Sequence, residues 1–113
     1  MASTTRYTKA KNEALRTYAQ SGGDSTFQAV GSAFTEPVRM LKFKNDGNTD
    51  CYISYDGTTT HDIILAGDRE IEDLTTNKTI DEGLTRKEGT QIYAKSVSGT
   101  GNLYITTIYA SKT

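Results

Sequence analysis

The stretch of residues 36–60 constrains the fold most, because it holds two apolar runs with turn signals between and after them. The first run lies at 38–43. The second, at 51–55, alternates Cys, Ile and Tyr with other residues at the period of two that is typical of a β-strand. Asn45-Asp46-Gly47-Asn48 separates the runs and Asp56-Gly57 follows the second; both sequences favour tight turns. This stretch predicts two strands paired as a β-hairpin.

Strand candidates recur at short spacing along the rest of the chain. The full set is 26–30, 38–44, 51–55, 61–65, 69–74, 91–97 and 103–109. The segment 38–44 has apolar residues on both faces, which predicts either a strand buried on both sides or one with a bulge. Acidic residues flank Ile71 in 69–74, as in an exposed or edge strand. The pattern is mainly β and favours an antiparallel β-sandwich or jelly roll over an α/β fold.

The N-terminal segment predicts a short α-helical arm. Ser3, Thr4 or Thr5 is placed to cap a helix that ends near Gln20. Its apolar stripe is thin, so the helix needs a docking surface on its own domain or on a neighbour. The sequence 21–24, with its Gly-Gly pair, predicts a hinge. We therefore expect an arm and hinge at 1–24 and a β-sandwich domain at 25–113.

Composition restricts the functional classes. A chain of 113 residues with a formal net charge of -1 has no global attraction to nucleic acid or anionic membranes. Its single cysteine excludes an internal disulfide. No apolar run approaches the roughly 20 residues that span a bilayer, and no apolar segment typical of a signal peptide begins the chain. We expect a protein of a cytoplasm-like setting without membrane or specific nucleic-acid partners.

Residues with catalytic potential are few and scattered. His61 is the only histidine, and no Gly-x-Ser-x-Gly motif accompanies it. Cys51 lies in a predicted strand and is expected to be a small buried residue. Asp46, Asn48 and Asp50 have the alternation of calcium ligands, but the glycine and the closing glutamate of an EF-hand loop are not in place. We expect no catalytic site, no metal and no cofactor.

Charge is distributed unevenly along the chain. In the predicted arm, the basic residues Arg6, Lys9, Lys11 and Arg16 face one acid, Glu13. Between 46 and 73, acidic residues greatly outnumber the one base, Arg69. This asymmetry suits head-to-tail contacts between subunits. A helix packed on its own sheet is the alternative interpretation.

Two segments together resemble a known class of proteins. They are VRMLKFKNDGNTDCYISYDGTTTHDIILAG, followed by a loop with Thr76-Asn77-Lys78, and GTQIYAKSVSGTGNLYITTIYA near the C-terminus. Within them the likeness is carried by the Ile53-Ser54-Tyr55-Asp56-Gly57 strand and turn, the Gly89-Thr90-Gln91-Ile92-Tyr93 entry to a late strand, and the closing strand 104–109. The chain here resembles small structural proteins of tailed bacteriophage virions. The resemblance covers about the last two-thirds of the chain and leaves out the predicted arm.

The resemblance implies a non-enzymatic β-sandwich building block used in many copies on a virion, after assembly in the host cytoplasm. It implies a capsid cement or decoration protein, or a head-tail connector, collar or tail ring component. Its partners would be capsid, portal or tail proteins and further copies of itself, as a homo-oligomer or symmetric array. The interface candidates are Tyr7, Leu15 and Tyr18 for arm docking, Arg6, Lys9, Lys11 and Arg16 as cations, and Glu70, Glu72 and Asp73 as an acidic surface.

Two other functional classes stay open. One is a receptor- or carbohydrate-binding module of a fibre or spike, using Tyr52, Asp56 and Asn77. The absence of tryptophan from the chain argues against sugar stacking. The other is an enzyme that depends on His61.

Overall fold

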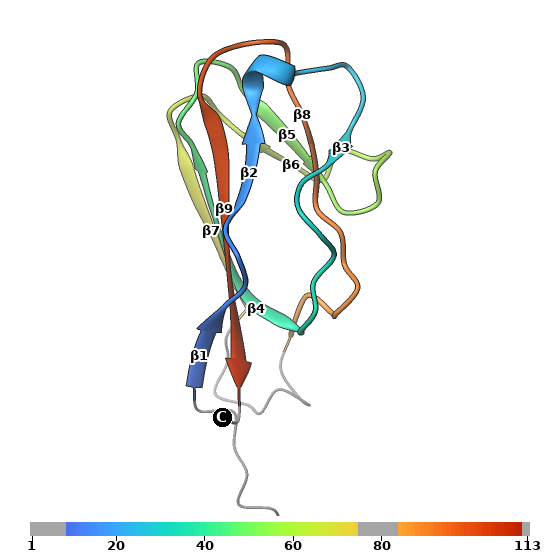
Figure 1. The fold of residues 1–113 in the computed structure, drawn as a ribbon, viewed down its shortest axis with the longest axis vertical. Coiled ribbons are helices and arrows are strands. Elements are labelled where there is room, and N and C mark those ends of the chain that lie inside the picture. Colours follow the sequence, from blue (N-terminus) through green and yellow to red (C-terminus); the bar gives the residue numbers. More distant parts are fainter. Residues whose placement is uncertain (1–8, 75–83, 112–113) are drawn as a thin grey trace, which may run out of the picture.

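The computed structural model describes residues 9–74 and 84–111, which form nine strands in two antiparallel sheets (Figure 1). The first sheet holds β1 (Lys9–Asn12), β2 (Arg16–Ala19), β4 (Val38–Asn45), β7 (Arg69–Asp73) and β9 (Asn102–Ser111). The second holds β3 (Gln28–Ala29), β5 (Cys51–Ser54), β6 (Asp62–Ile64) and β8 (Tyr93–Lys95). The expectation of a mainly β protein is confirmed, and the arrangement is sandwich-like.

Strand order places β4 and β9 at the centre of the first sheet. That order is β1-β9-β4-β7, and β2 also pairs with β9; the second sheet runs β3-β8-β5-β6. Leu41, Phe43 and Ile105 point inward from the first sheet and Ile53 and Ile92 lie against them, all at most 1% exposed. Burial of each such side chain contributes about 1.5–3 kcal/mol. The core therefore lies between the two sheets.

A β-bulge interrupts β4 near its start. Val38 lies opposite Tyr109 on β9, whereas Met40 lies opposite the next residue, Ile108. Arg39 is therefore the extra residue. Of the two interpretations that the sequence left for this strand, the bulge is present.

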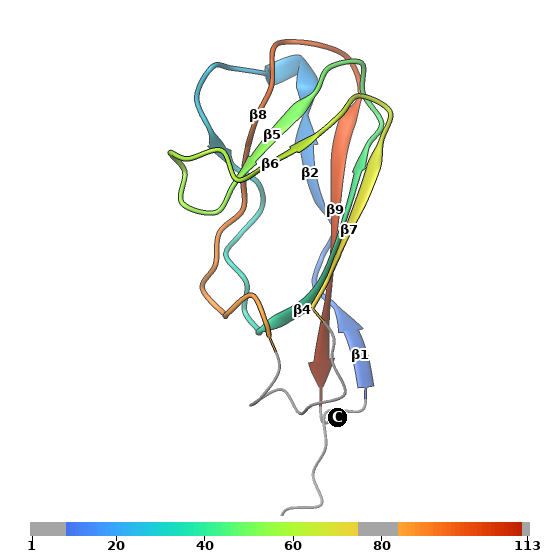
Figure 2. The ribbon, with the colours of Figure 1, turned by 180° about the vertical axis from the view of Figure 1, so that it is seen from behind.

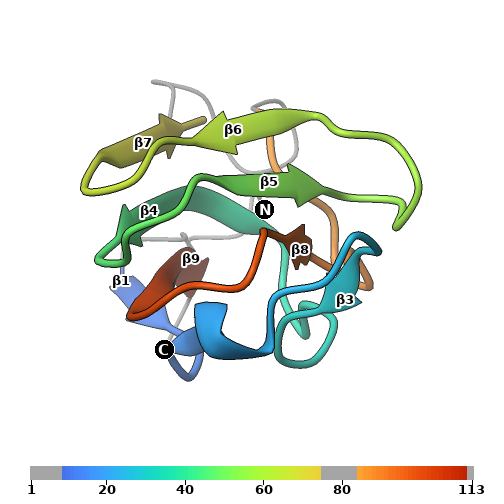
Figure 3. The same ribbon diagram turned by 90° about the horizontal axis from the view of Figure 1, so that it is seen from above.

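The predicted hairpin of the 36–60 stretch is wrong. β4 pairs with β7 and β9, and β5 pairs with β6 and β8 in the other sheet. The connection at 46–50 therefore crosses from one sheet to the other, at the end of the molecule seen in Figure 3. A short turn-rich connection serves a sheet-to-sheet crossing as well as a hairpin, and local sequence does not separate the two.

The predicted α-helical arm is also wrong, because residues 9–12 and 16–19 are strands that pair with β9. In β2, Arg16 and Tyr18 are buried and Thr17 is exposed, which is the period of a strand. Pairing with β9 satisfies the backbone groups of this segment and buries the Tyr18 ring, whereas a lone helix with a thin stripe buries little. This pairing joins a strand of the expected arm, residues 1–24, to a strand of the expected β-sandwich domain, residues 25–113. The described residues contain only a 3₁₀ helix, η1 (Gln20–Gly22).

A buried amide network closes the end of the sandwich where the chain crosses between sheets. Gln20, fully buried, donates through Nε2 to Asn45 Oδ1 at 2.7 Å and to the Thr49 carbonyl at 3.1 Å. Its Oε1 accepts hydrogen bonds from the Thr49 backbone and hydroxyl. Asn45 donates in turn to the carbonyls of Thr49 and Ile64. The network ties η1 to the end of β4, to the 46–50 connection and to β6.

Substitution of Tyr18 distinguishes a strand of the sandwich from a detachable arm. Tyr18→Ala removes a side chain that is 5% exposed and is expected to lower the free energy of unfolding by about 3 kcal/mol. Thr17→Ala, at the exposed neighbouring position, is expected to change it by less than about 0.5 kcal/mol. Urea unfolding measures both values. Equal effects of the two substitutions would contradict the packing of β2.

Candidate functional site

The most exposed part of the first sheet is a two-stranded ribbon made by β1 and the C-terminal end of β9. Lys9 pairs with Ser111 and Asn12 with Ile108, and all four β1 residues are exposed. The ribbon extends past the strands of the second sheet (Figures 1 and 2). No other described strand pairs with the outer edge of β1. Of the predicted arm cations, Lys9 and Lys11 lie here, whereas Arg6 and the predicted docking residue Tyr7 lie outside the described residues.

An ion pair fixes the bend between the ribbon and β2. The Glu13 carboxylate accepts hydrogen bonds from Arg16 Nη2 at 2.7 Å and from the backbone and hydroxyl of Thr35. Burial opposes ionisation of Glu13, but the hydrogen bonds from Arg16 and Thr35 outweigh it and lower the pKa of Glu13. Arg16 also donates to the Ser32 carbonyl at 2.9 Å and lies over the Phe34 ring. The bend is therefore held by contacts within the chain.

The other interface candidates of the predicted arm, Leu15, Arg16 and Tyr18, differ in their exposure. Arg16 and Tyr18 are both 5% exposed, and the Tyr18 hydroxyl lies 3.3 Å from Ser96 Oγ in the core. Leu15, on the bend, is 58% exposed. Only Lys9, Lys11 and Leu15, among the described members of that set, present a surface to a partner.

The opposite edge of the same sheet is β7, which carries the predicted acidic residues. Glu70 and Glu72 lie opposite Phe43 and Leu41, so both carboxylates point to the core side of the sheet at its rim. Arg86 binds Glu72 through two hydrogen bonds of 2.8 and 2.9 Å. Asp73, the third predicted acid, is exposed at the end of the strand. The charge of Glu72 is thus already matched.

Glu70 has a different environment, because the charged groups that shift its pKa are carboxylates. Its hydrogen bond with Asp62 on β6, partial burial and the negative charges of Asp62, Glu72 and Asp68 raise the pKa of Glu70 to about 7. Among the described residues no lysine or arginine forms an ion pair with Glu70 or Asp62. Sequence reasoning missed Asp62 because β6 and β7 belong to different sheets, and no local spacing brings them together.

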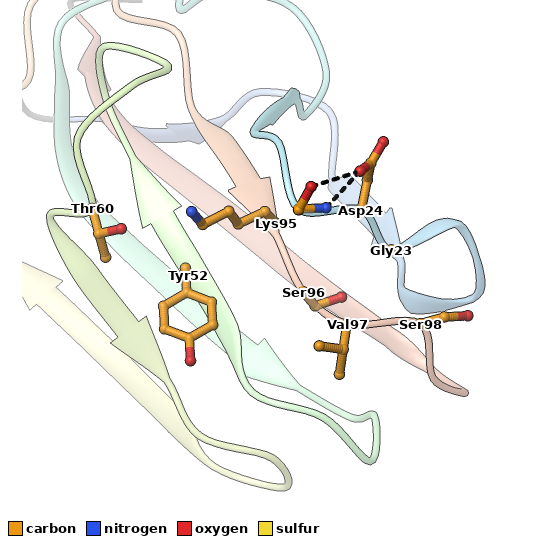
Figure 4. Close-up of a pocket in the computed structure, with 9 residues that line it drawn as sticks. Gly23, Asp24, Tyr52, Thr60, Lys95, Ser96, Val97 and Ser98 are labelled. Carbon is orange, nitrogen blue, oxygen red and sulfur yellow. Dashed lines mark hydrogen bonds between the residues drawn. The ribbon is translucent and has the colours of Figure 1, made fainter.

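A groove of about 630 Å³ lies over the second sheet (Figure 4). Lys95 extends across it, with Nζ 4.5 Å from the centre of the Phe27 ring and 5.9 Å from that of Tyr52. The lining residues are Gly23, Asp24, Ser25, Tyr52, Thr60, Lys95, Ser96, Val97 and Ser98. Of the residues that the sequence suggested for ligand binding, Tyr52 lines this groove, Asp56 does not, and Asn77 lies outside the described residues.

The residues singled out for possible chemistry have structural contacts instead. His61 Nδ1 accepts the Tyr55 backbone N–H at 3.0 Å, and its Nε2 lies 3.9 Å from Asp56. Cys51 is fully buried, and burial raises the pKa of its thiol. The Asn48 and Asp50 side chains each accept a backbone N–H from a different loop. Across residues 9–74 and 84–111, no group of three or more His, Cys, Asp or Glu side chains is placed to hold a metal ion.

Searches for relatives do not assign a family. No protein-family model, curated protein or solved structure matched this chain. No helix among the described residues has the length and apolar character needed to cross a membrane.

The Asp62–Glu70 pair predicts a specific dependence of stability on pH. Since the pKa of Glu70 is raised from 4.5 to about 7 in the folded state, its stabilising contribution is complete below about pH 4.5 and is lost as the pH rises through 7. Glu70→Gln keeps a hydrogen-bonding group without the charge. We expect the melting temperature of Glu70→Gln to exceed that of the parent chain by about 4 °C at pH 8, because loss of the repulsion between the carboxylates stabilises the fold by about 1 kcal/mol. At pH 4.5 the two melting temperatures should be equal.

Thermal unfolding at the two pH values measures this difference, with Glu88→Gln at an exposed site as the control. A gap between Glu70→Gln and the parent that is the same at both pH values would contradict a raised pKa of Glu70.

Proposed function

We propose that this chain is a non-enzymatic structural protein that assembles in many copies on a tailed-phage virion. It acts as a capsid cement or decoration protein, or as a head-tail connector or tail ring component. Its partners are capsid, portal or tail proteins and further copies of itself, and it joins the particle in the host cytoplasm.

The ribbon of β1 and β9 is the observation that carries this proposal. β1 contributes no buried residue to its own chain, although pairing with β9 holds it in a defined conformation. A two-stranded ribbon gains little stability by itself in water, and an edge strand presents free N–H and C=O groups that another chain can pair with. Such a strand is well suited to make its contacts in an assembly.

Two further features support the proposal. The resemblance of segments 38–67 and 89–110 to small virion proteins falls on strands that build both sheets. The ribbon carries Lys9 and Lys11, while the far edge of the sheet carries Glu70 and Glu72. Opposite charges at opposite edges favour repeated association in one orientation.

Charge reversal on the ribbon tests the proposal. A chain with Lys9→Glu and Lys11→Glu is expected to fold with unchanged stability, since both positions are exposed, and to be incorporated into particles at least about tenfold less. Lys42→Glu with Lys44→Glu, at exposed positions of β4, provides a matched control and is expected to be incorporated normally.

The copy number of each variant in purified particles, measured by quantitative mass spectrometry, decides the result. Higher salt should weaken attachment of the parent chain, because exposed charges are screened. Normal incorporation of the Lys9→Glu and Lys11→Glu chain would refute a role for the ribbon.

A second function, recognition of a receptor glycan at a fibre or spike, rests on the groove over the second sheet. Tyr52 offers a ring for stacking against a sugar, Lys95 offers a cation for an anionic substituent, and Thr60 and Ser98 are hydroxyl-bearing residues of the lining. This combination favours acidic over neutral glycans.

A glycan array tests this second function. If the groove binds acidic glycans, Tyr52→Ala and Lys95→Ala should each reduce binding at least about tenfold, which corresponds to 1.4 kcal/mol. Tyr104→Ala, which removes an aromatic ring from the other sheet, should leave binding unchanged. No binding by the parent chain would dismiss the groove as a glycan site.

A further inference from the structure

We propose that β1 of one copy pairs with β7 of the next copy, so that the first sheets of neighbouring subunits join into one continuous antiparallel sheet. In this pairing Lys11 lies directly opposite Glu70. The inference rests on the proposed assembly function and specifies the partner, a second copy of this chain, and the register of the contact.

Within residues 9–74 and 84–111, neither edge of the first sheet is covered by another strand. The strand order β1-β9-β4-β7 places β1 at one end and β7 at the other, and no further described strand pairs with either outer edge. Each edge strand therefore has a row of backbone donors and acceptors directed away from its own sheet. Pairing between copies would satisfy both rows at once.

The direction of the strands fits a head-to-tail contact. Every neighbouring pair in the sheet is antiparallel, so β1 and β4 run one way while β9 and β7 run the other. When two copies stand side by side in the same orientation, β1 of one meets an oppositely directed β7 of the other. The contact is heterologous, since it uses different surfaces on the two copies, and it can repeat without limit or close into a ring.

Side-chain faces also match across the contact. Lys11 lies opposite Tyr109, which lies opposite the buried Val38, so Lys9 and Lys11 lie on the face that continues the core side of the sheet. Glu70 and Glu72 lie on the same face. Since paired residues share a face, the lysines meet the glutamates, and Ala10 meets the exposed Ile71 on the outer face.

Charge selects the register. Arg86 already neutralises Glu72, but Glu70 is held against Asp62 with no cation among the described residues. A neighbour's Lys11 ammonium at this point would supply the positive charge that the two carboxylates lack. The register that follows pairs Lys11 with Glu70, Ala10 with Ile71 and Lys9 with Glu72.

This register gives the assembly a definite stagger. Lys11 pairs with Tyr109 of β9. Glu70 pairs with Phe43 of β4, and Phe43 pairs with Ile105 of β9, so Glu70 lies at the height of Ile105. The two levels differ by 109 − 105 = 4 residues, or about 13 Å along the strands. Successive copies are therefore displaced along the strand direction. In a closed ring such a displacement appears as strand tilt.

Cysteine cross-linking tests the register on the full chain. Two single variants, Ala10→Cys and Ile71→Cys, are mixed at pH 8 under mild oxidation, in concentrated solution and in purified particles. Within one chain β9 and β4 lie between these residues, which places them at least about 14 Å apart, too far for a disulfide. A cross-linked dimer of the two variants is the expected product. Ala10→Cys mixed with Val97→Cys, an exposed site in the loop that follows β8 of the other sheet, should give none.

Exchange of charges provides an independent readout. Lys11→Glu and Glu70→Lys should each lower association at least about tenfold by sedimentation velocity, and a chain with both substitutions should recover it. Loss of stability does not explain such a pattern, because Glu70→Lys relieves the repulsion from Asp62.

The outcomes separate the two proposals. A specific Ala10–Ile71 product together with recovery by the doubly substituted chain supports the strand pairing. Multimers or particles that contain the chain but give no such product overturn the pairing and leave the assembly function intact. A chain that stays monomeric at every concentration and is absent from particles overturns the assembly function and the pairing with it.

Discussion

The fold depends on how buried polar groups are satisfied where the chain crosses between its two sheets. A sandwich needs such crossings, and each one turns backbone groups toward an apolar interior, where an unpaired donor or acceptor costs about 1–3 kcal/mol. Gln20 and Asn45 meet this need, because their amides bond to each other and to the Thr49 backbone. One fully satisfied network thereby holds the ends of strands from both sheets together.

Sequence periodicity predicts most of the strands, and it predicts their exposure. Alternation around Ile53 and Ile105 predicted strands there, and both residues lie in the core because one face of each strand is buried. The acids around Ile71 indicated an edge strand, and β7 is one. Apolar residues on both faces after Val38 admitted a bulge, which the shift in register confirms. Each of these features follows from residues close together in sequence.

Pairings between distant residues are what the sequence does not reveal. The hairpin prediction failed because Asn45, which looked like a turn residue, turns inward to bond with Gln20, 25 residues away. The helix prediction failed because pairing with β9, near the other end of the chain, outweighs weak local helix preference. For the same reason Arg16 was expected on the surface. The acidic edge was predicted from the sequence, but the contact of Glu70 with Asp62, which raises the pKa of Glu70, was not.

The closed end of the sandwich also limits how this protein can vary. A side chain at Gly47 would collide with the Gln20 amide, and one at Gly101, where φ is +93°, would strike the Asp46 carbonyl. Neither loop has room for even a methyl group. Residues 58–60, by contrast, are exposed on the loop between β5 and β6. Natural divergence and deliberate grafting of foreign peptides should therefore concentrate in that segment, leaving the crossing loops almost invariant in length.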